Sequence, residues 1–204
     1  MEPISHSLTS TLVGGSPALD FTNTASGRGT EFYLDRLTSL ADLFAWAEHA
    51  GLTSGVSPPA AAQDEPARNN LALVAATALR ETIHAAMHAI ATGKPAPDAA
   101  LAQLRDAAAL RLPALALEGG VDGHYDWVPA TTPTTLEAIL GRIALSAIDL
   151  LRSAPLARLK CCPGHDCGWL FLDTTKNGTR RWCDMSVCGN RAKAKRHRAR
   201  IRCD

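Results

Sequence analysis

The sequence predicts an α+β fold in two parts: a mostly helical N-terminal domain with a small β element, and a smaller cysteine-rich module at the C-terminus. Three observations predict it. The 204 residues are 46% hydrophobic but only 5% aromatic, and an apolar content that depends on Ala and Leu favours helices over an all-β fold. Apolar residues recur at helical spacing in several segments, with one hairpin signal between them. All six cysteines lie in the last quarter of the chain.

Charge divides the chain at nearly the same place. Residues 158–204 carry 12 Lys or Arg against four Asp, a net charge of +8. The rest of the chain carries nine basic and 16 acidic groups, a net charge of −7. We therefore expect an acidic body, residues 1–155, and a basic module, residues 156–204, with the body partly masking the basic segment.

The first elements of the body follow from periodicity and turn residues. The first 30 residues are rich in glycine turns around a short apolar piece. A helix is predicted from about Thr38 to Ala50, where Gly51 ends it. Residues 53–67 are mostly small residues and prolines, which predict a loop. A long helix then runs to about Ala91.

Three further elements complete the body. Residues 98–111 predict a helix with Asp98 as its N-cap. Residues 114–128 hold two glycine turn signals between β-tolerant stretches, which predict a hairpin. Thr134 begins an apolar helix with capping-box spacing, and this helix ends near Pro155, the predicted domain boundary.

Four of the cysteines form two C-x4-C pairs separated by fifteen residues. The predicted metal ligands are Cys162, Cys167, Cys183 and Cys188. Zinc in structural sites takes four ligands tetrahedrally, and thiolates suit it. A reducing compartment favours metal binding over disulfides. Four thiolates leave no open position for a catalytic water, so we expect one structural Zn²⁺ per chain.

Three other side chains near these pairs have different interpretations. Cys161 would form a C-x5-C pair with Cys167 and could replace Cys162, although the symmetric pairing is preferred. His165 could compete for the metal, but a turn residue that faces solvent is the preferred interpretation. Cys203 is interpreted as a free thiol.

The segment between the cysteine pairs predicts a hairpin that brings them together. Residues 168–173 have strand character, Asn177 and Gly178 form a type I′ turn signal, and residues 179–182 return towards the second pair. A helix-forming run follows Cys188. A knuckle, a hairpin and a helix in this order are typical of a treble-clef zinc finger.

Residues 191–202 read RAKAKRHRARIR and would surround a helix with positive charge. Such charges repel one another unless an anion neutralises them, and nucleic-acid phosphates are the natural partner. A solvated, partly frayed tail is the alternative, but fusion to a zinc module favours nucleic acid. The predicted base-reading residues are Arg180, Arg181, Asn190 and Arg191. The predicted phosphate contacts are Lys193, Lys195, Arg196 and Arg198.

These residues also resemble a known family. The runs Cys-x4-Cys-Gly-Trp-Leu-Phe-Leu-Asp from Cys162, Asn-Gly-Thr-Arg-Arg-Trp-Cys-Asp-Met from Asn177 and Cys-Gly-Asn-Arg-Ala-Lys from Cys188 are similar to the CGNR zinc finger. In that bacterial family the finger follows an ABATE domain. The beginning of this chain resembles that domain in Gly-Gly at Gly14, in Leu-Asp-Phe-x-Asn-Thr from Leu19, and in the helix patterning that follows. The resemblance implies an α+β N-terminal domain, a zinc-binding finger that contacts DNA, and a stress-induced transcription regulator.

The predicted function is therefore a DNA-binding transcription regulator whose N-terminal domain senses a ligand or a partner. Asp20, Asn23 and Arg28 lie between glycine turns and are the candidate ligand pocket, although Asx residues in turns more often satisfy local backbone groups. One alternative is a zinc module that binds RNA or protein. The other is an enzyme with an active site near Asp20 and Asn23, which we rank last because the chain has no Ser-His-Asp arrangement and no phosphate-binding glycine loop.

The remaining expectations concern location and assembly. No apolar run approaches the 18 or so residues of a membrane span, and the N-terminus lacks the basic region of a signal peptide. We therefore expect a cytoplasmic protein without a membrane partner. A single finger reads few bases, which is compatible with a homodimer on DNA.

Overall fold

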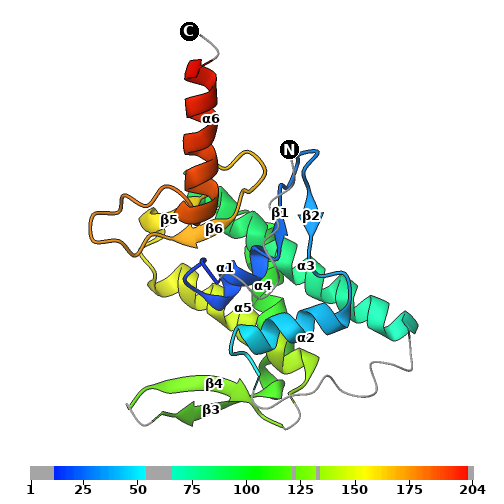
Figure 1. Ribbon diagram of the computed structural model, residues 1–204. Helices are drawn as coiled ribbons and strands as arrows, with labels where there is room; N and C mark the ends of the chain where they lie inside the picture. The colour runs from blue at the N-terminus through cyan, green and yellow to red at the C-terminus, as the bar shows by residue number, and fades with distance from the viewer. Residues whose placement is uncertain (1–11, 54–65, 121–122, 132–133, 202–204) are drawn as a thin grey trace.

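A computed structural model describes residues 12–53, 66–120, 123–131 and 134–201 of the protein (Figure 1). The helices are α1 (Pro17–Thr22), α2 (Leu40–His49), α3 (Pro66–Ala91), α4 (Asp98–Arg111), α5 (Leu136–Ser153) and α6 (Asn190–Ile201). Three antiparallel strand pairs accompany them: β1 (Ala25–Ser26) with β2 (Leu34–Asp35), β3 (Leu115–Gly119) with β4 (Tyr125–Pro129), and β5 (Leu159–Cys161) with β6 (Leu170–Leu172). This confirms the predicted α+β fold. Among the helices of the described residues, none combines the length and apolar character that a membrane span requires.

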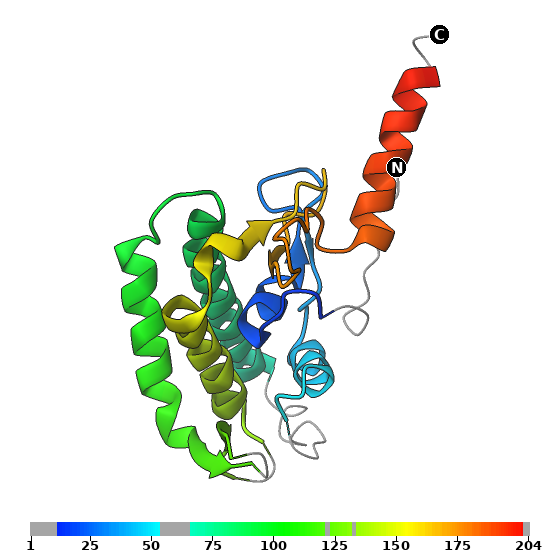
Figure 2. The same ribbon diagram turned by 90° about the vertical axis from the view of Figure 1, so that its left-hand side faces the viewer.

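The main core lies between α1, α3, α4 and α5. Figure 2 shows α3, α4 and α5 side by side, with α1 against them. The α5 sequence buries a helical stripe that includes Ile139, Ile143 and Ala147, because residues three or four apart lie on one face of a helix. Two strand residues of the C-terminal module, Leu159 and Leu170, belong to the same core. The side of the module that carries Leu159 and Leu170 is therefore packed into the core of the body.

The predicted helices of the body are present, with corrections at their caps. Ser39 caps α2 in a capping box with Asp42. The N-cap of α4 is Pro97, so Asp98 is the first helical residue and was wrongly predicted as the cap. The cap of α5 is Thr135, whose hydroxyl accepts a hydrogen bond from the Ala138 amide, and the prediction of Thr134 was wrong by one residue.

Other expectations for the body have mixed outcomes. The predicted hairpin is confirmed as β3 and β4, in which Leu117 pairs with Trp127. The predicted loop over 53–67 falls largely on residues 54–65, which lie outside the described residues, and α3 already begins at Pro66. Cys203 also lies outside them. The boundary between residues 155 and 156 stays a prediction.

The hairpin predicted between the cysteine pairs is wrong. Strand β6 pairs with β5, which precedes the first cysteine pair, and residues 179–182 form no strand. The other edge of β6 is already covered, because the Leu172 amide donates to the Gly14 carbonyl at 2.8 Å. The following loop instead folds around Asp173, whose buried carboxylate accepts hydrogen bonds from the Lys160 ammonium and the Arg180 amide. The knuckle and the helix of the predicted treble clef are present, and its central hairpin is absent from the described residues.

The turn before the second cysteine pair is at the predicted place but of another type. The Gly178 amide donates to the Thr175 carbonyl, and Gly178 has a φ of 63°. Asn177 does not have a positive φ, as a type I′ turn would require at both central residues.

Helix α6 projects from the rest of the molecule. Both views show it pointing away from the helices of the body (Figures 1 and 2). The helix leaves the zinc-binding cysteines in a direction that takes its charges away from α2, α3, α4 and α5. The expectation that the acidic body partly masks the basic segment stays a prediction.

Candidate metal centre and nucleic-acid interface

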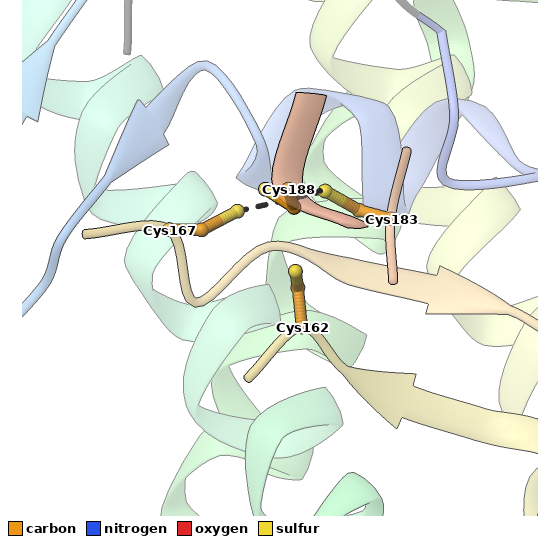
Figure 3. A group of neighbouring side chains, drawn as sticks. All are labelled: Cys162, Cys167, Cys183 and Cys188. Carbon is orange, nitrogen blue, oxygen red and sulfur yellow. Dashed lines mark hydrogen bonds between the residues drawn. The ribbon is translucent and has the colours of Figure 1, made fainter. Parts of the chain in front are cut away.

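The structure brings four cysteine side chains to one point. The sulfur atoms of Cys162, Cys167, Cys183 and Cys188 all lie within 4.8 Å of one another, and all four residues are buried. Figure 3 shows the four side chains converging. The Cys183 sulfur lies 3.5 Å from that of Cys167 and 3.6 Å from that of Cys188. Tetrahedral zinc with Zn–S bonds of about 2.3 Å needs sulfurs about 3.8 Å apart, so the site fits one Zn²⁺.

Two short turns position the ligands. The first, residues 162–167, joins β5 to β6 and is called the knuckle below. It requires Gly164, because a Cβ there would lie 2.9 Å from the Cys167 Cβ and 3.3 Å from the Cys188 sulfur. The second is the π-helical turn η4 (Met185–Gly189), which contains Cys188 and continues into α6. The Asp184 carboxylate caps this turn by accepting from the Ser186 amide.

The chemistry of the crowded sulfurs also fits a cation. Hydrogen bonds between the thiols lower the pKa of Cys162 and raise the pKa of Cys167 and of Cys183. Zinc binds thiolates and favours their deprotonation, so the metal makes this burial of four sulfurs favourable. The four cysteines form the single structural zinc site that the sequence predicts.

The two alternatives for the ligand set are resolved. Cys161 is adjacent to Cys162 on an extended strand, so their side chains point to opposite faces. The Cys161 thiol faces the Gly168 carbonyl at 3.5 Å and packs against the main core. His165 is exposed, and its ring lies 5.2 Å from that of Phe32. Neither residue belongs to the sulfur cluster.

Arg180, a predicted base-reading residue, has a structural position. Its guanidinium donates to the carbonyls of Val13, Leu172, Trp182 and Cys183. It also lies over the Phe171 ring at 4.4 Å. These bonds use four of the five N–H donors of the side chain. We therefore leave Arg180 out of the nucleic-acid interface.

The other predicted nucleic-acid residues lie in the loop before the second cysteine pair and along α6. Arg181 is exposed beside the Trp182 ring, and the Asn190 amide donates to the Ser186 carbonyl. Arg191 is half-buried in an ion pair with Asp166 of the knuckle. The remaining candidates along the helix are all exposed: Lys193, Lys195, Arg196 and Arg198.

The side chains of the candidate ligand pocket, Asp20, Asn23 and Arg28, are each used within the fold, although Arg28 also lines a cavity beside His84 and His165. The Asp20 carboxylate is buried and accepts from the Gly14 amide at 2.7 Å. The Asn23 amide bonds both backbone groups of Leu170, and Arg28 pairs with Glu81. A ligand-binding role for these three residues stays a prediction. These polar side chains satisfy buried backbone groups and charges, as Asx residues in turns commonly do.

Sequence reasoning missed a buried ion-pair network behind this segment. Arg80 of α3 is 1% exposed and makes a bidentate pair with Asp35 at 2.6 and 2.7 Å. Glu81 bridges Arg80 to Arg28. The available signal was the helical spacing, which places Arg80 on the same face as Ile83 and so in the core.

Two family models match the chain. The ABATE model, described as "Putative stress-induced transcription regulator", matches residues 15–154. The CGNR zinc finger model matches residues 158–201, which include the four converging cysteines. No curated protein matches the chain.

Proposed function

The chain belongs to the ABATE family and ends in a CGNR zinc finger, and from this premise we propose that it is a DNA-binding transcription regulator. Zinc holds the finger, and α6 inserts into the major groove of duplex DNA. The zinc site has a structural role, since four thiolates leave no open position for a substrate.

The exposed position of α6 carries this proposal. The helix has six Lys or Arg residues and no acid, and it projects alone from the body (Figure 1). Its twelve residues span about 18 Å at 1.5 Å per residue, and the major groove admits one α-helix. A helix with this charge is favoured beside phosphates, which release counterions on binding.

The interface can be divided by the position of each side chain. Arg181 precedes the second cysteine pair and Asn190 begins α6, and both are exposed. Both are proposed to read base edges, because Arg suits guanine and Asn suits adenine. The exposed cations at Lys193, Lys195, Arg196 and Arg198 are proposed to contact phosphates.

Truncation after Arg191 tests this interface. Binding of the zinc-loaded full chain and of the truncated chain to a randomised duplex library would be measured at several salt concentrations. We expect the truncation to remove most of the affinity and to make the salt dependence shallower, by about 0.9 in slope for each phosphate that is no longer neutralised. Arg105→Ala on α4, which also removes an exposed cation, is the control and should bind like the wild type.

The same measurement separates the other functions. A preference for single-stranded RNA over duplex DNA would favour an RNA-binding module. Binding to neither nucleic acid would favour a protein partner. Enrichment of a palindromic duplex would support a homodimer, since the symmetry of a site mirrors that of the protein.

We place the sensing role of the N-terminal domain at another pocket. A cavity of about 490 Å³ lies between one face of α5, Trp127 of β4 and Leu172 of β6. Its lining is mainly apolar, with Asp149 among the polar groups, as in many small-molecule sites. A bound effector would contact both the body and a strand of the finger. Small molecules that raise the melting temperature of the wild type but not of Asp149→Trp would support this site, and equal stabilisation of both proteins would reject it.

Location follows from the thiol chemistry. Zinc-binding thiolates persist in a reducing compartment, so we propose that the protein acts in the cytoplasm.

A further inference from the structure

Helix α6 is connected to the body at one end only. It continues from the turn that contains the zinc ligand Cys188, and its other end points into solvent (Figures 1 and 3). The sequence NRAKAKRHRARI offers no apolar face that could pack on the body. The direction of the helix therefore depends on interactions at its first turn.

One such interaction joins α6 to the other half of the zinc site. The Arg191 guanidinium lies 2.8 Å from the Asp166 carboxylate, and Asp166 directly precedes the ligand Cys167 in the knuckle. The Asp166 side chain is only 8% exposed, whereas that of Arg191 is 41% exposed. A buried carboxylate is costly unless a cation pairs with it, so this pair is retained in the folded protein.

We propose that Asp166 and Arg191 form a clamp that sets the direction of α6 relative to the zinc centre. The helix is then held at two points, at Cys188 along the chain and at the knuckle through Arg191. This assigns Arg191 a positioning role, and the base-reading role passes to Arg181 and Asn190. The inference rests on the proposed DNA binding for its use, but the clamp itself is a property of the protein alone.

The clamp can be tested without DNA. Residual dipolar couplings of backbone amides report whether α6 and the body share one orientation, in wild type and in Asp166→Asn, each loaded with one zinc per chain. We expect the α6 order parameter to fall from about 0.85, typical of rigid backbone, towards about 0.6 in the variant. Arg191→Gln should give the same loss, and it serves as the test if Asp166→Asn fails to retain zinc. An α6 that keeps the order of the wild type in both variants would overturn the clamp.

A second measurement uses the sign of the charge change. Asp166→Asn removes a negative charge near the DNA, so electrostatics alone predicts tighter binding. The clamp predicts weaker binding, by about tenfold if the freed helix spends a tenth of its time in the productive direction. The salt slope should be unchanged, because the phosphate contacts remain. Asp204→Asn removes the same charge from the same module and should bind as tightly as the wild type or more tightly.

The double variant Asp166→Asn with Arg191→Gln completes the test. If both residues act through one contact, the double variant loses no more affinity than either single variant. If Arg191 reads a base, its substitution alone changes the preferred sequence and the losses add, which would overturn the positioning role. If the proposed function is wrong, neither the wild type nor any variant will bind duplex DNA. The dipolar couplings would still decide whether the clamp exists.

Discussion

The contact between Asn23 and β6 gives the sharpest prediction for stability. The Asn23 side chain is 4% exposed, accepts from the Leu170 amide at 2.9 Å and donates to the Leu170 carbonyl at 2.8 Å. Leu170 is fully buried, belongs to the main core, and lies three residues after the zinc ligand Cys167. Asn23→Ala would leave one buried N–H and one buried C=O without partners. At about 1–3 kcal/mol for each of the two unsatisfied groups, the free energy of unfolding should fall by about 2–6 kcal/mol.

Urea unfolding of the zinc-saturated full chain would measure this loss. Asn177→Ala is the matched control, since Asn177 is exposed in a turn, and surface substitutions usually change stability by less than about 0.5 kcal/mol. Tryptophan fluorescence should show one shared transition for body and finger, at a lower urea midpoint in Asn23→Ala. A loss as small as that of Asn177→Ala would refute the view that Asn23 fastens the finger to the body.

Three further predictions concern single side chains. Cys183→Ser should abolish stoichiometric zinc binding, whereas Cys161→Ser should retain one zinc per chain by metal analysis; equal loss in both would contradict the ligand assignment. Burial raises the pKa of Asp20 from 3.8 to about 6, so this group favours folding below pH 4 and loses that contribution as the pH rises through 6. Asp20→Asn should therefore gain stability relative to wild type between pH 4 and 7, by up to about 3 kcal/mol, and a pH-independent difference would reject this. Arg80→Ala should cost about 3–5 kcal/mol by leaving Asp35 partly buried without its bidentate partner, and thermal unfolding that matches the wild type would show the pair to be dispensable.

Much of the fold could be predicted because its signals are local. Helical periodicity and turn residues define α2, α4 and α5 to within a few residues, and the glycine turn signals define the β3–β4 hairpin. The cap of α5 was misplaced because Thr134 and Thr135 are adjacent and both suit an N-cap. The pairing of β5 with β6 could not be predicted in this way, because a strand of three residues such as Leu159–Cys161 is too short to show an alternation of apolar and polar residues.

The candidate site was predictable in part for the same reason. Ligand spacing identifies the four cysteines, because each close pair comes from one local turn. The roles of Arg180, Arg191 and Asn23 depend on partners far away in the sequence, and no local pattern reports them. A basic residue beside a zinc site suggests nucleic-acid binding. Whether its side chain is available to bind depends on the partner that it already has within the protein.

Those distant partners show that the finger is packed against the body through backbone groups of both parts. The Gly27 amide donates to the Cys167 carbonyl, the Trp169 indole donates to the Ala25 carbonyl, and the Leu172 amide donates to the Gly14 carbonyl. A fragment of residues 156–204 would lose all three bonds and would expose Leu159 and Leu170 from the main core. In that fragment, zinc alone would have to order the β5–β6 hairpin, which the body supports in the full chain. The segment before α2 therefore contributes directly to the order of the zinc ligands, because the same backbone groups satisfy both parts of the chain.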